Sequence, residues 1–534
     1  MAILSIAWAL LITSARLGLV SASKPCIADT FRSLELNNIN ILSLNVTAVR
    51  NYLTDDSASD GVTSAPTGRI PLTVDICFVS LTYTHPGQND VVNTYIGLPL
   101  DVSNWNTRFL MDGGGGWTAG GLDEIISPVA SGYSSSSTDG GHNSTTSTAD
   151  WGFVSEGNTN WPALWDFSSV ALGEAATLGK MATEIYFKSS PKYSYWNGCS
   201  TGGRQGHMMA QRFPTYFDGI VAGSPAINWD RFQLAEYWPA FLAQFLDTQP
   251  PACVLNAFTD AAIQACDLLD GVKDGIISLP GQCHFKASSI VGQTVNCNNP
   301  YGQITITDRM ADLVRGMWEG PISLEDQFEW YGLNYDADLT SLLTTTCTSL
   351  HNCTVIPFSI SADWARVFLA RNSSFSVQGL TRQDFDNLFR ESVDQYASII
   401  GTHNTDLTSF MVAGGKMISW HGMQDELIPT NGTVDYYSRV MDRDPDVADY
   451  YRFYLAPGVA HCGGGPGFDP SDTVFKTLRA WVENGTVPDT LGAIATAVAG
   501  SNSSSTRTAQ LCLYPEIFTY VGGDPNDASS FGCV

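Results

Sequence analysis

The chain has 534 residues, of which 44% are hydrophobic and 15% are charged, so it is long and apolar enough to bury one or two substantial cores. Asp and Glu total 53 against 27 Lys and Arg, which gives a formal net charge of −26. This negative charge argues against nucleic acid and other polyanions as partners.

The N-terminal residues 1–22 are predicted to be a signal peptide. They hold a long apolar stretch and end in the small residues Val20, Ser21 and Ala22, which suit a signal peptidase, although no basic residue precedes the stretch. A membrane anchor is the alternative, and the short length and the interruption by Ser and Arg16 argue against it. No later segment looks long and apolar enough to span. We therefore expect a secreted, extracellular protein and no membrane partner.

Cysteines and glycosylation signals support the same location. The 12 cysteines are even in number, as expected of a disulfide-bonded protein in an oxidising compartment. Seven Asn-X-Ser/Thr sequons predict glycans. They are at Asn45, Asn143, Asn352, Asn372, Asn431, Asn484 and Asn502.

A glycine run follows the first predicted strands. Residues 71–100 alternate apolar and polar side chains, as strands do, and a strand over 108–112 then leads into Gly113–Gly116. A nucleotide-binding turn is disfavoured because Thr118 occupies the place of the third glycine in that motif. We predict an oxyanion hole instead, since glycine lets backbone N–H groups approach a reacting oxygen closely.

The next predicted elements are a helix over 161–187, a short strand over 193–196 and a second helix that includes Met208 and Met209. The strand and the second helix are joined by Gly198-Cys199-Ser200-Thr201-Gly202, the G-x-S-x-G pattern of a nucleophile elbow. Chance glycines around a serine are the alternative. The oxyanion donors are expected to be the amides of Thr201, Gly114 and Gly115.

An acid and a base follow in the order that the elbow predicts. Asp425 and His461 each come after a strand-like run, so the chain order is Ser, Asp, His. We expect Ser200 to be the nucleophile, His461 its base and Asp425 the carboxylate that orients the imidazole. His421 remains an alternative base.

Cys199 and Cys462 directly adjoin the predicted serine and histidine. A disulfide between them would hold Ser200 and His461 within reach of each other. The alternative, Cys199 as the nucleophile, needs a free thiolate, and Cys462 beside the histidine favours a disulfide in a secreted chain.

These motifs resemble the fungal tannase and feruloyl esterase family. The resemblance is carried by residues 198–206, 421–429 and 457–463 and extends over nearly the whole mature chain. It implies an α/β-hydrolase core with a large inserted lid domain, the roles given above for Ser200, Asp425 and His461, and the Cys199–Cys462 disulfide as a family hallmark.

The predicted domain organisation follows from this resemblance and from a change in pattern. Residues 23–228 and 396–534 are expected to form the catalytic domain. Residues 229–395 are expected to form the lid, because alternating strand patterns thin out there and cysteines cluster.

An acidic loop in the predicted lid holds Asp267, Asp270 and Asp274. Closely spaced carboxylates on a turning backbone suit Ca²⁺, although their spacing departs from an EF-hand, and an acidic surface turn is the alternative. The resemblance implies a calcium ion here, with the carbonyl groups of Val272 and Ile276 as further ligands. Its role is expected to be structural, because the loop is far from Ser200 in the sequence.

The remaining disulfide pairings rest on different grounds. Cys266 and Cys283 bracket the acidic loop and are expected to pair. The family pattern implies Cys26–Cys77 and Cys512–Cys533, proximity suggests Cys347–Cys353, and elimination leaves Cys253–Cys297. Spacing alone does not determine connectivity.

We expect a secreted serine carboxylic ester hydrolase that cleaves aromatic esters, of the feruloyl or hydroxycinnamoyl type, through an acyl-enzyme. Thr201 after the serine leans toward feruloyl esterases. A tannase acting on galloyl esters is the alternative, toward which residues 250–253 lean. A non-catalytic protein that binds phenolic compounds or carbohydrate on the same fold is the alternative of another class.

Overall fold

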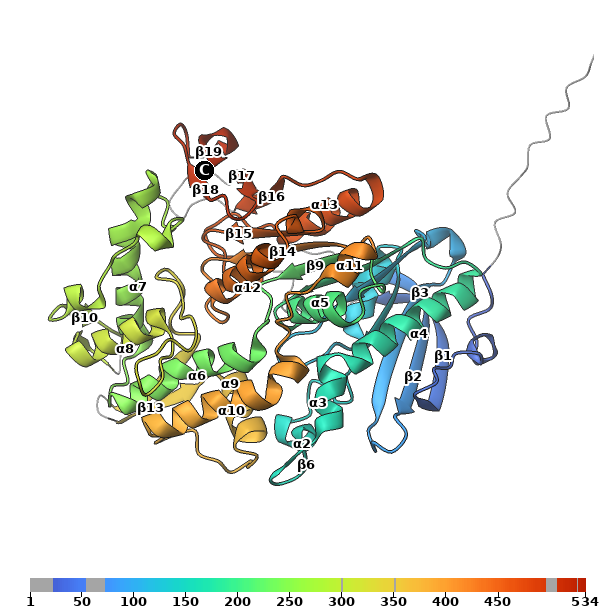
Figure 1. Cartoon of the computed structure of the whole chain (residues 1–534), viewed down its shortest axis with the longest axis horizontal. Helices are drawn as coiled ribbons and strands as arrows, with labels where there is room; N and C mark the ends of the chain where they lie inside the picture. The colour runs from blue at the N-terminus through green and yellow to red at the C-terminus, as the bar shows by residue number, and fades with distance from the viewer. Residues whose placement is uncertain (1–22, 54–72, 299–300, 350–351, 496–506, 526) are drawn as a thin grey trace, which may run out of the picture.

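The computed structural model describes residues 23–53, 73–298, 301–349, 352–495, 507–525 and 527–534 (Figure 1). The predicted signal peptide, residues 1–22, and the sequon at Asn502 lie outside the described residues.

A nine-stranded mixed sheet forms the centre of the protein, in the order β1-β2-β3-β5-β4-β8-β9-β14-β15. The first three pairs in this order are antiparallel, and all pairs from β5 to β15 are parallel. The strands are β1 (Asn40–Leu53), β2 (Thr73–Thr84), β3 (Val92–Pro99), β4 (Arg108–Asp112), β5 (Ser134–Thr138), β8 (Tyr193–Cys199), β9 (Gly219–Gly223), β14 (Lys416–Gly422) and β15 (Tyr451–Ala456).

Both faces of the parallel part of the sheet are covered. On one face, Leu172, Met209 and Tyr436 of three helices share a buried cluster with strand residues. On the other face, a helix and a hairpin contribute Leu478 and Leu511 to a second cluster. Every residue of β9 is therefore buried, as is usual for parallel strands. The covering elements are α4 (Val170–Phe187), α5 (Thr201–Arg212), α12 (Thr430–Arg443), α13 (Ser471–Asn484), β16 (Thr490–Ala495) and β17 (Arg507–Cys512).

The helix predicted over 161–187 is two helices, α3 (Trp161–Ser168) and α4. The break is at Ser169, whose φ of −163° and ψ of −38° are not helical. Smaller elements complete the fold outside the insertion described next. They are α1 (Ile126–Ala130), α2 (Thr148–Gly152), α11 (Thr408–Val412), β6 (Phe153–Ser155), β7 (Asn158–Thr159), β18 (Phe518–Tyr520) and β19 (Phe531–Cys533).

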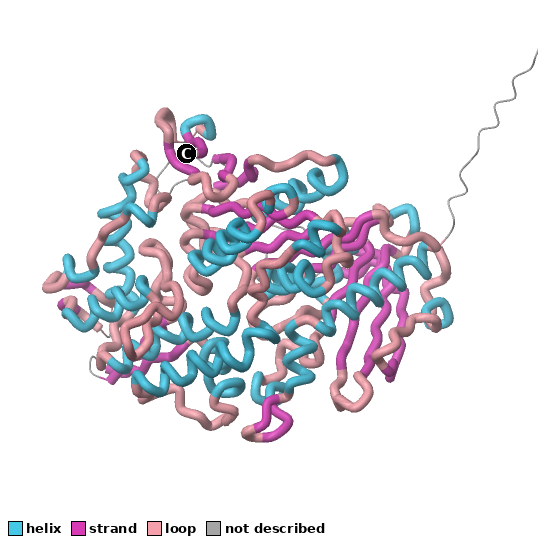
Figure 2. The backbone as a smooth tube through the Cα atoms, viewed as in Figure 1, coloured by secondary structure: helices cyan, strands magenta, loops and turns pink. Residues whose placement is uncertain are grey.

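Between β9 and β14 the chain leaves the sheet and forms a largely helical insertion. Figure 2 shows this helical part beside the strands of the sheet. Its core includes Trp238, Phe241, Leu313 and Phe385. The insertion contains α6 (Trp229–Phe245), α7 (Ala252–Cys266), α8 (Asp308–Glu319), α9 (Ser359–Asp363), α10 (Arg382–Ile400), β10 (Thr294–Asn296), β11 (Gln303–Thr305), β12 (Leu343–Ser349) and β13 (Asn352–Pro357).

The predicted lid, residues 229–395, begins at the start of one helix and ends inside another. Its predicted first residue, Trp229, is the first residue of α6. Its predicted end at residue 395 falls inside α10, which packs against α6. α10 runs on to Ile400 and also contacts α3, so an end of the lid at residue 400 would leave this helix whole. The division into domains remains a prediction.

We expected no segment after the predicted signal peptide to be long and apolar enough to span a membrane. The segment Ala252–Asp270, which consists of α7 and the turn that follows it, meets this criterion by length and composition. Val254, Leu255 and Phe258 are nevertheless buried in the core of the insertion. One face of α7 is therefore packed on the core of the insertion.

Five of the six predicted disulfides are present among the described residues, and several disulfides fit an extracellular protein. They are Cys26–Cys77, Cys199–Cys462, Cys253–Cys297, Cys266–Cys283 and Cys512–Cys533. The strand pairing places Cys347 opposite Cys353, and their predicted bond remains a prediction because the side chain of Cys347 is not described.

Candidate active site

Ser200 lies in the sharp turn between β8 and α5, as the elbow pattern predicts. Its φ of 59° and ψ of −125° are strained for a residue with a side chain. The turn is fixed by hydrogen bonds from the Ser200 N–H to the Gly223 carbonyl (3.0 Å) and from the Arg204 N–H to the Ser200 carbonyl (3.0 Å). A Cβ atom on Gly198 would lie 2.6 Å from the Gly202 backbone. Only glycine therefore fits at position 198.

Asp425 and His461 are brought together by the loops after β14 and β15. The Asp425 carboxylate lies 2.8 Å from His461 Nδ1, and its other oxygen accepts the N–H groups of Leu427 (2.9 Å) and Ile428 (2.8 Å). Burial raises the pKa of Asp425, but the adjacent His461 and His421 outweigh it and hold this pKa well below its usual range. Burial lowers the pKa of His461, and Asp425 more than compensates, so this pKa lies above its ordinary value. Asp425 is thus an ionised partner that orients the imidazole and stabilises its charged form.

His421 is a second partner of the same carboxylate. Its Nε2 lies 3.0 Å from Asp425 and 3.2 Å from the Ile428 carbonyl, both of which only accept, so Nε2 carries the proton. Its Nδ1 lies 2.8 Å from Thr433 Oγ1. Both ring nitrogens are therefore engaged and His421 is fully buried, which leaves His461 as the histidine that can exchange a proton with Ser200.

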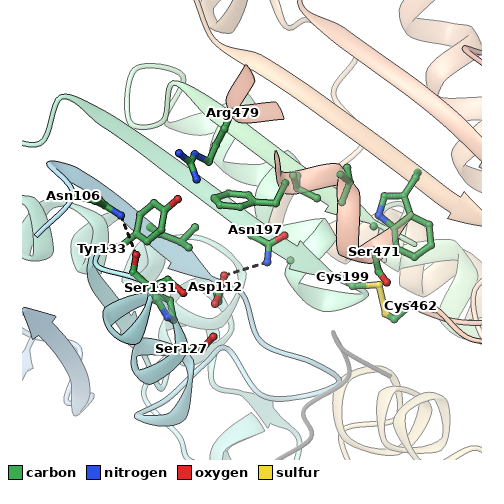
Figure 3. Close-up of a pocket in the computed structure, with 18 residues that line it drawn as sticks. Asn106, Asp112, Ser127, Ser131, Tyr133, Asn197, Cys199, Cys462, Ser471 and Arg479 are labelled. Atoms are coloured by element: carbon green, nitrogen blue, oxygen red, sulfur yellow. Dashed lines mark hydrogen bonds between the residues drawn. A yellow bond between two sulfur atoms is a disulfide. The ribbon is translucent and has the colours of Figure 1, made fainter. Parts of the chain in front are cut away.

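Ser200 and His461 line one narrow cavity of about 20 Å³. Cys199 and Cys462, the residues beside them, form a disulfide with a Cα–Cα distance of 5.8 Å across a sequence separation of 263 residues. Figure 3 shows this bridge lining a different cavity, of about 360 Å³, which also includes Asp112, Asn197 and Ser471. The bridge therefore ties the serine turn to the histidine loop without itself lining the narrow cavity.

The predicted oxyanion donors need one correction. The Gly114 N–H is already donated to Gln205 Oε1 (3.0 Å), so it is not available to a substrate. Gly115 does not line the cavity with Ser200, whereas Thr201 and Gly116 do. The Thr201 hydroxyl donates to the Gly116 carbonyl (2.8 Å) and holds the glycine run against α5.

Gly116 was missed because the sequence does not show which glycine of a run reaches the serine. Its φ of 53° lies in the left-handed region that favours glycine. The amides of Thr201 and Gly116 have no acceptor among the described residues. Because both residues also line the cavity with Ser200, their amides are the candidate donors to an oxyanion.

The other side of the cavity comes from the insertion and was not predicted. The residues are Trp229, Phe232, Gln233, Glu236, Phe358 and Ile360. Leu427 and Ile428, which follow Asp425, complete the lining. No sequence motif marks the insertion residues, because they reach Ser200 only through the packing of the insertion on the sheet.

The predicted calcium loop follows α7 directly. Asp267 is buried and accepts the N–H groups of Asp274 (3.0 Å) and Gly275 (3.1 Å), while one buried oxygen of Asp270 has no partner. Burial, and then the charges of Asp270 and Asp267, raise the pKa of Asp274 to about 6. Mutually repelling, partly buried carboxylates with an unpaired oxygen fit a bound cation.

The predicted calcium loop is closer to the predicted catalytic residues than its sequence position suggests. A Cβ atom on Gly458 would lie 2.8 Å from Ile276 Cδ1, so Ile276 lies against the loop that carries His461. In addition, Asp336 accepts from Ile277 N–H (3.3 Å) and from Gln424 Nε2 (3.2 Å). Two contacts therefore join the predicted metal loop to the loops of the triad.

A different group brings three metal-ligating atoms within 4.8 Å of one another. It consists of His85, Asp90 and Asp166 and could hold a metal ion; the three loop aspartates do not form such a group. His85 already contacts Asp90 through Nδ1 (2.5 Å) and Glu174 through Nε2 (2.9 Å). Burial lowers the pKa of His85, but these hydrogen bonds raise it to about 9. The raised pKa favours an imidazolium that is held by Asp90 and Glu174.

Five predicted glycosylation sites are exposed, which glycan attachment requires. They are Asn45, Asn143, Asn372, Asn431 and Asn484. Asn352 lies in β13, and its side chain is not described.

Comparisons with known proteins agree with this geometry. A family model described as tannase and feruloyl esterase matches residues 77–534. A probable feruloyl esterase of Arthroderma benhamiae is 40% identical over 471 residues, which cover 86% of each chain. A tannase of Aspergillus oryzae is 28% identical and covers 93% of this chain and 90% of its own. The solved structure of a tannin acyl hydrolase from Aspergillus niger has a TM-score of 0.82 at 25% identity and covers 96% of this chain and 93% of that chain.

The covered parallel sheet and the elbow after β8, with an acid after β14 and a histidine after β15, define an α/β-hydrolase fold. The chain belongs to the tannase and feruloyl esterase family and is therefore a carboxylic ester hydrolase. The predicted family, fold class and enzyme class are confirmed.

Proposed function

We propose that this protein is a secreted serine esterase that cleaves esters of aromatic acids, of the feruloyl or hydroxycinnamoyl type, through an acyl-enzyme. The observation that carries the proposal is the convergence of Ser200 and an Asp425-oriented His461 on one cavity. The similarity to a probable feruloyl esterase supports the aromatic acyl group. A galloyl ester is the second candidate substrate, favoured by the similarity to the Aspergillus niger tannin acyl hydrolase.

In the first half-reaction Ser200 Oγ attacks the ester carbonyl carbon while His461 Nε2 takes the hydroxyl proton. The amides of Thr201 and Gly116 stabilise the negative oxygen of the tetrahedral intermediate. The C–O bond to the alcohol then breaks, and His461 returns the proton to the leaving alcohol. Water, activated by His461, hydrolyses the acyl-enzyme and releases the aromatic acid.

The insertion acts as a lid in this proposal and spans residues 229–400. Its aromatic and aliphatic side chains, such as Trp229 and Ile360, close the cavity over Ser200. The cavity is narrow in this structure, with a volume of about 20 Å³. We infer that the insertion moves away from the sheet to admit the aromatic ring, and that closure afterwards excludes water from the reaction.

One experiment distinguishes an esterase from a protein that binds aromatic esters without cleaving them. Methyl ferulate, methyl 4-hydroxycinnamate and methyl gallate should each be incubated with the purified protein, with and without a serine-directed phosphonate. We expect repeated turnover, faster on the two cinnamates, and its complete loss after one phosphonate has bound per molecule. Ligand binding without turnover would instead support a non-catalytic binding protein, and faster release of gallate would support a tannase.

The proposed cofactor is a structural Ca²⁺ ion in the acidic loop. Asp267, Asp270 and Asp274 would hold it through carboxylates, and Val272 and Ile276 through carbonyl groups. The unpaired buried oxygen of Asp270 supports this site. The Cys266–Cys283 disulfide closes the chain around the loop and would limit its freedom when the ion is absent.

Removal of calcium is expected to lower the Tm, and added Ca²⁺ should restore it, because an ion that binds only the native loop stabilises the folded state. The Tm should be measured with chelator, with Ca²⁺ and with Mg²⁺, alongside metal analysis of the purified protein. The Asp270→Asn variant should lower the Tm and remove its response to chelator, while Asp472→Asn, far from the loop in the sequence, is the matched control. Purified protein without bound calcium and with an unchanged Tm in added Ca²⁺ would contradict the proposal.

A further inference from the structure

Two polar side chains of the insertion line the cavity that holds Ser200 and His461. Gln233 and Glu236 lie three residues apart on α6, on the same helix face as Trp229 and Phe232. Both are almost completely buried, with exposed fractions of 1% and 2%. One oxygen of each, Gln233 Oε1 and Glu236 Oε2, has no hydrogen-bond partner among the described residues.

Burial of unpaired polar atoms is unfavourable. Two such atoms in an active-site cavity therefore indicate that a bound ligand supplies their hydrogen bonds. The side chains of Asp425 and His421 are bonded, with four partners and three. Trp229 Nε1, which also lines the cavity, is buried without a partner among the described residues, like the oxygens of Gln233 and Glu236. The unpaired polar atoms of the lining therefore gather on one face of α6. The triad chemistry described above uses neither Gln233 nor Glu236.

The chemistry of the pair defines what it can bind. Burial, followed by the charge of Asp425, raises the pKa of Glu236 well above its usual range, which favours the neutral carboxyl. A neutral carboxyl both donates and accepts a hydrogen bond, whereas Gln233 Oε1 only accepts. A hydroxyl group, which donates once and accepts, matches both side chains together.

The lining also argues against a charged ring substituent. Among the residues that the structure describes, no Lys or Arg lines the cavity, so an anionic group on the acyl ring would find no counter-charge there. Asp425 adds negative charge nearby. A carboxylate on the ring would be repelled, and a neutral hydroxyl would not.

We propose that Gln233 and Glu236 recognise a free phenolic hydroxyl on the aromatic ring of the acyl group. The inference rests on the proposed function and specifies its substrate. The acyl side is favoured over the alcohol side because α6 closes the cavity with Trp229 and Phe232, whereas the alcohol must leave to solvent. The phenol O–H donates to Gln233 Oε1 and accepts from the Glu236 carboxyl. Methylation of the phenol removes the donor and leaves Gln233 unpaired.

The test compares methyl 4-hydroxycinnamate with methyl 4-methoxycinnamate, which differ in a methyl group on the phenolic oxygen. We expect wild-type kcat/KM to favour the hydroxyl ester by about tenfold or more, because a site built around a hydroxyl leaves its own polar groups unpaired with the ether. Gln233→Leu and Glu236→Leu should each bring this ratio close to one. Glu236→Gln keeps a donor and an acceptor in the same place and should retain most of the preference. Gln244→Leu, the same substitution on α6 outside the cavity, should keep the wild-type ratio.

Binding to the Ser200→Ala variant tests the inference independently of turnover. Calorimetry with the same two esters should show the same preference, and adding Gln233→Leu should abolish it. Circular dichroism and Tm establish that each variant is folded. Equal binding of the two esters would overturn the inference, as would an unchanged preference in folded Gln233→Leu and Glu236→Leu variants. Absence of wild-type turnover together with a preserved binding preference would refute the proposed esterase function and leave the hydroxyl site standing.

Discussion

Ser200→Ala is expected to lower kcat/KM by about 10⁴-fold or more while the Tm and the circular dichroism spectrum stay near those of the wild type. The hydroxyl is the attacking group, and loss of a triad nucleophile leaves only the contribution of the oxyanion hole and binding. The measurement is hydrolysis of methyl ferulate by enzyme of known concentration. Ser288→Ala, an exposed serine in the insertion, is the matched control.

The other members of the triad extend this prediction. His461→Ala should be about as severe as Ser200→Ala, and Asp425→Asn should be less severe, because the carboxylate acts through the imidazole. His421→Gln should cost less than His461→Ala, since both ring nitrogens of His421 are engaged with protein atoms. Activity near that of the wild type in Ser200→Ala would refute the nucleophile, and a larger loss in His421→Gln than in His461→Ala would reverse the choice of base.

The second large effect is expected for the double variant Cys199→Ala, Cys462→Ala. Closing a loop with a sequence separation of 263 residues disfavours the unfolded chain by about 5 kcal/mol in the entropic model. The bridge also fixes the serine turn against the histidine loop, and a misplacement near 1 Å can lower the rate on the order of a hundredfold. We therefore expect lower Tm and also lower kcat/KM at temperatures where circular dichroism shows a folded protein.

The double variant Cys512→Ala, Cys533→Ala is the matched control for the bridge. It removes a disulfide with a sequence separation of 21 residues near the C-terminus, so it should lower the Tm without changing kcat/KM of the folded protein. If the Cys199 and Cys462 variant keeps wild-type kcat/KM while folded, the bridge contributes to stability alone.

The parts of the site that could be predicted are those fixed by local backbone chemistry. The turn at Ser200 needs glycine at position 198, because the Gly202 backbone approaches that position closely. The G-x-S-x-G pattern therefore makes this turn predictable from the sequence. Asp425 and His461 each follow a strand of the central sheet, and parallel strands bring their carboxyl ends to one edge. Strand patterns and chain order therefore predict that Ser200, Asp425 and His461 lie at one edge of the sheet.

What could not be predicted depends on packing between distant segments. Gly114 and Gly116 are alike in sequence, and only the contact with Gln205 shows that Gly114 is already bonded. In the sequence, Gln233 and Glu236 are ordinary polar residues of a helix. Only the packing of α6 over Ser200 shows that they line the cavity. The same limit applies to Ile276, which meets the loop of His461 through tertiary packing.

The position of the insertion between β9 and β14 has a consequence for how the enzyme is made. Synthesis runs from the N-terminus, and domains generally fold as units while the rest of the chain is still emerging. Ser200 and its turn are complete early, but Asp425, His461 and the last two strands arrive only after the whole insertion. Until then Cys199 has no native partner, although Cys253, Cys266, Cys283 and Cys297 have already been synthesised. The Cys199–Cys462 disulfide therefore cannot form, and Ser200 cannot meet His461, until residues 416–462 have entered the fold.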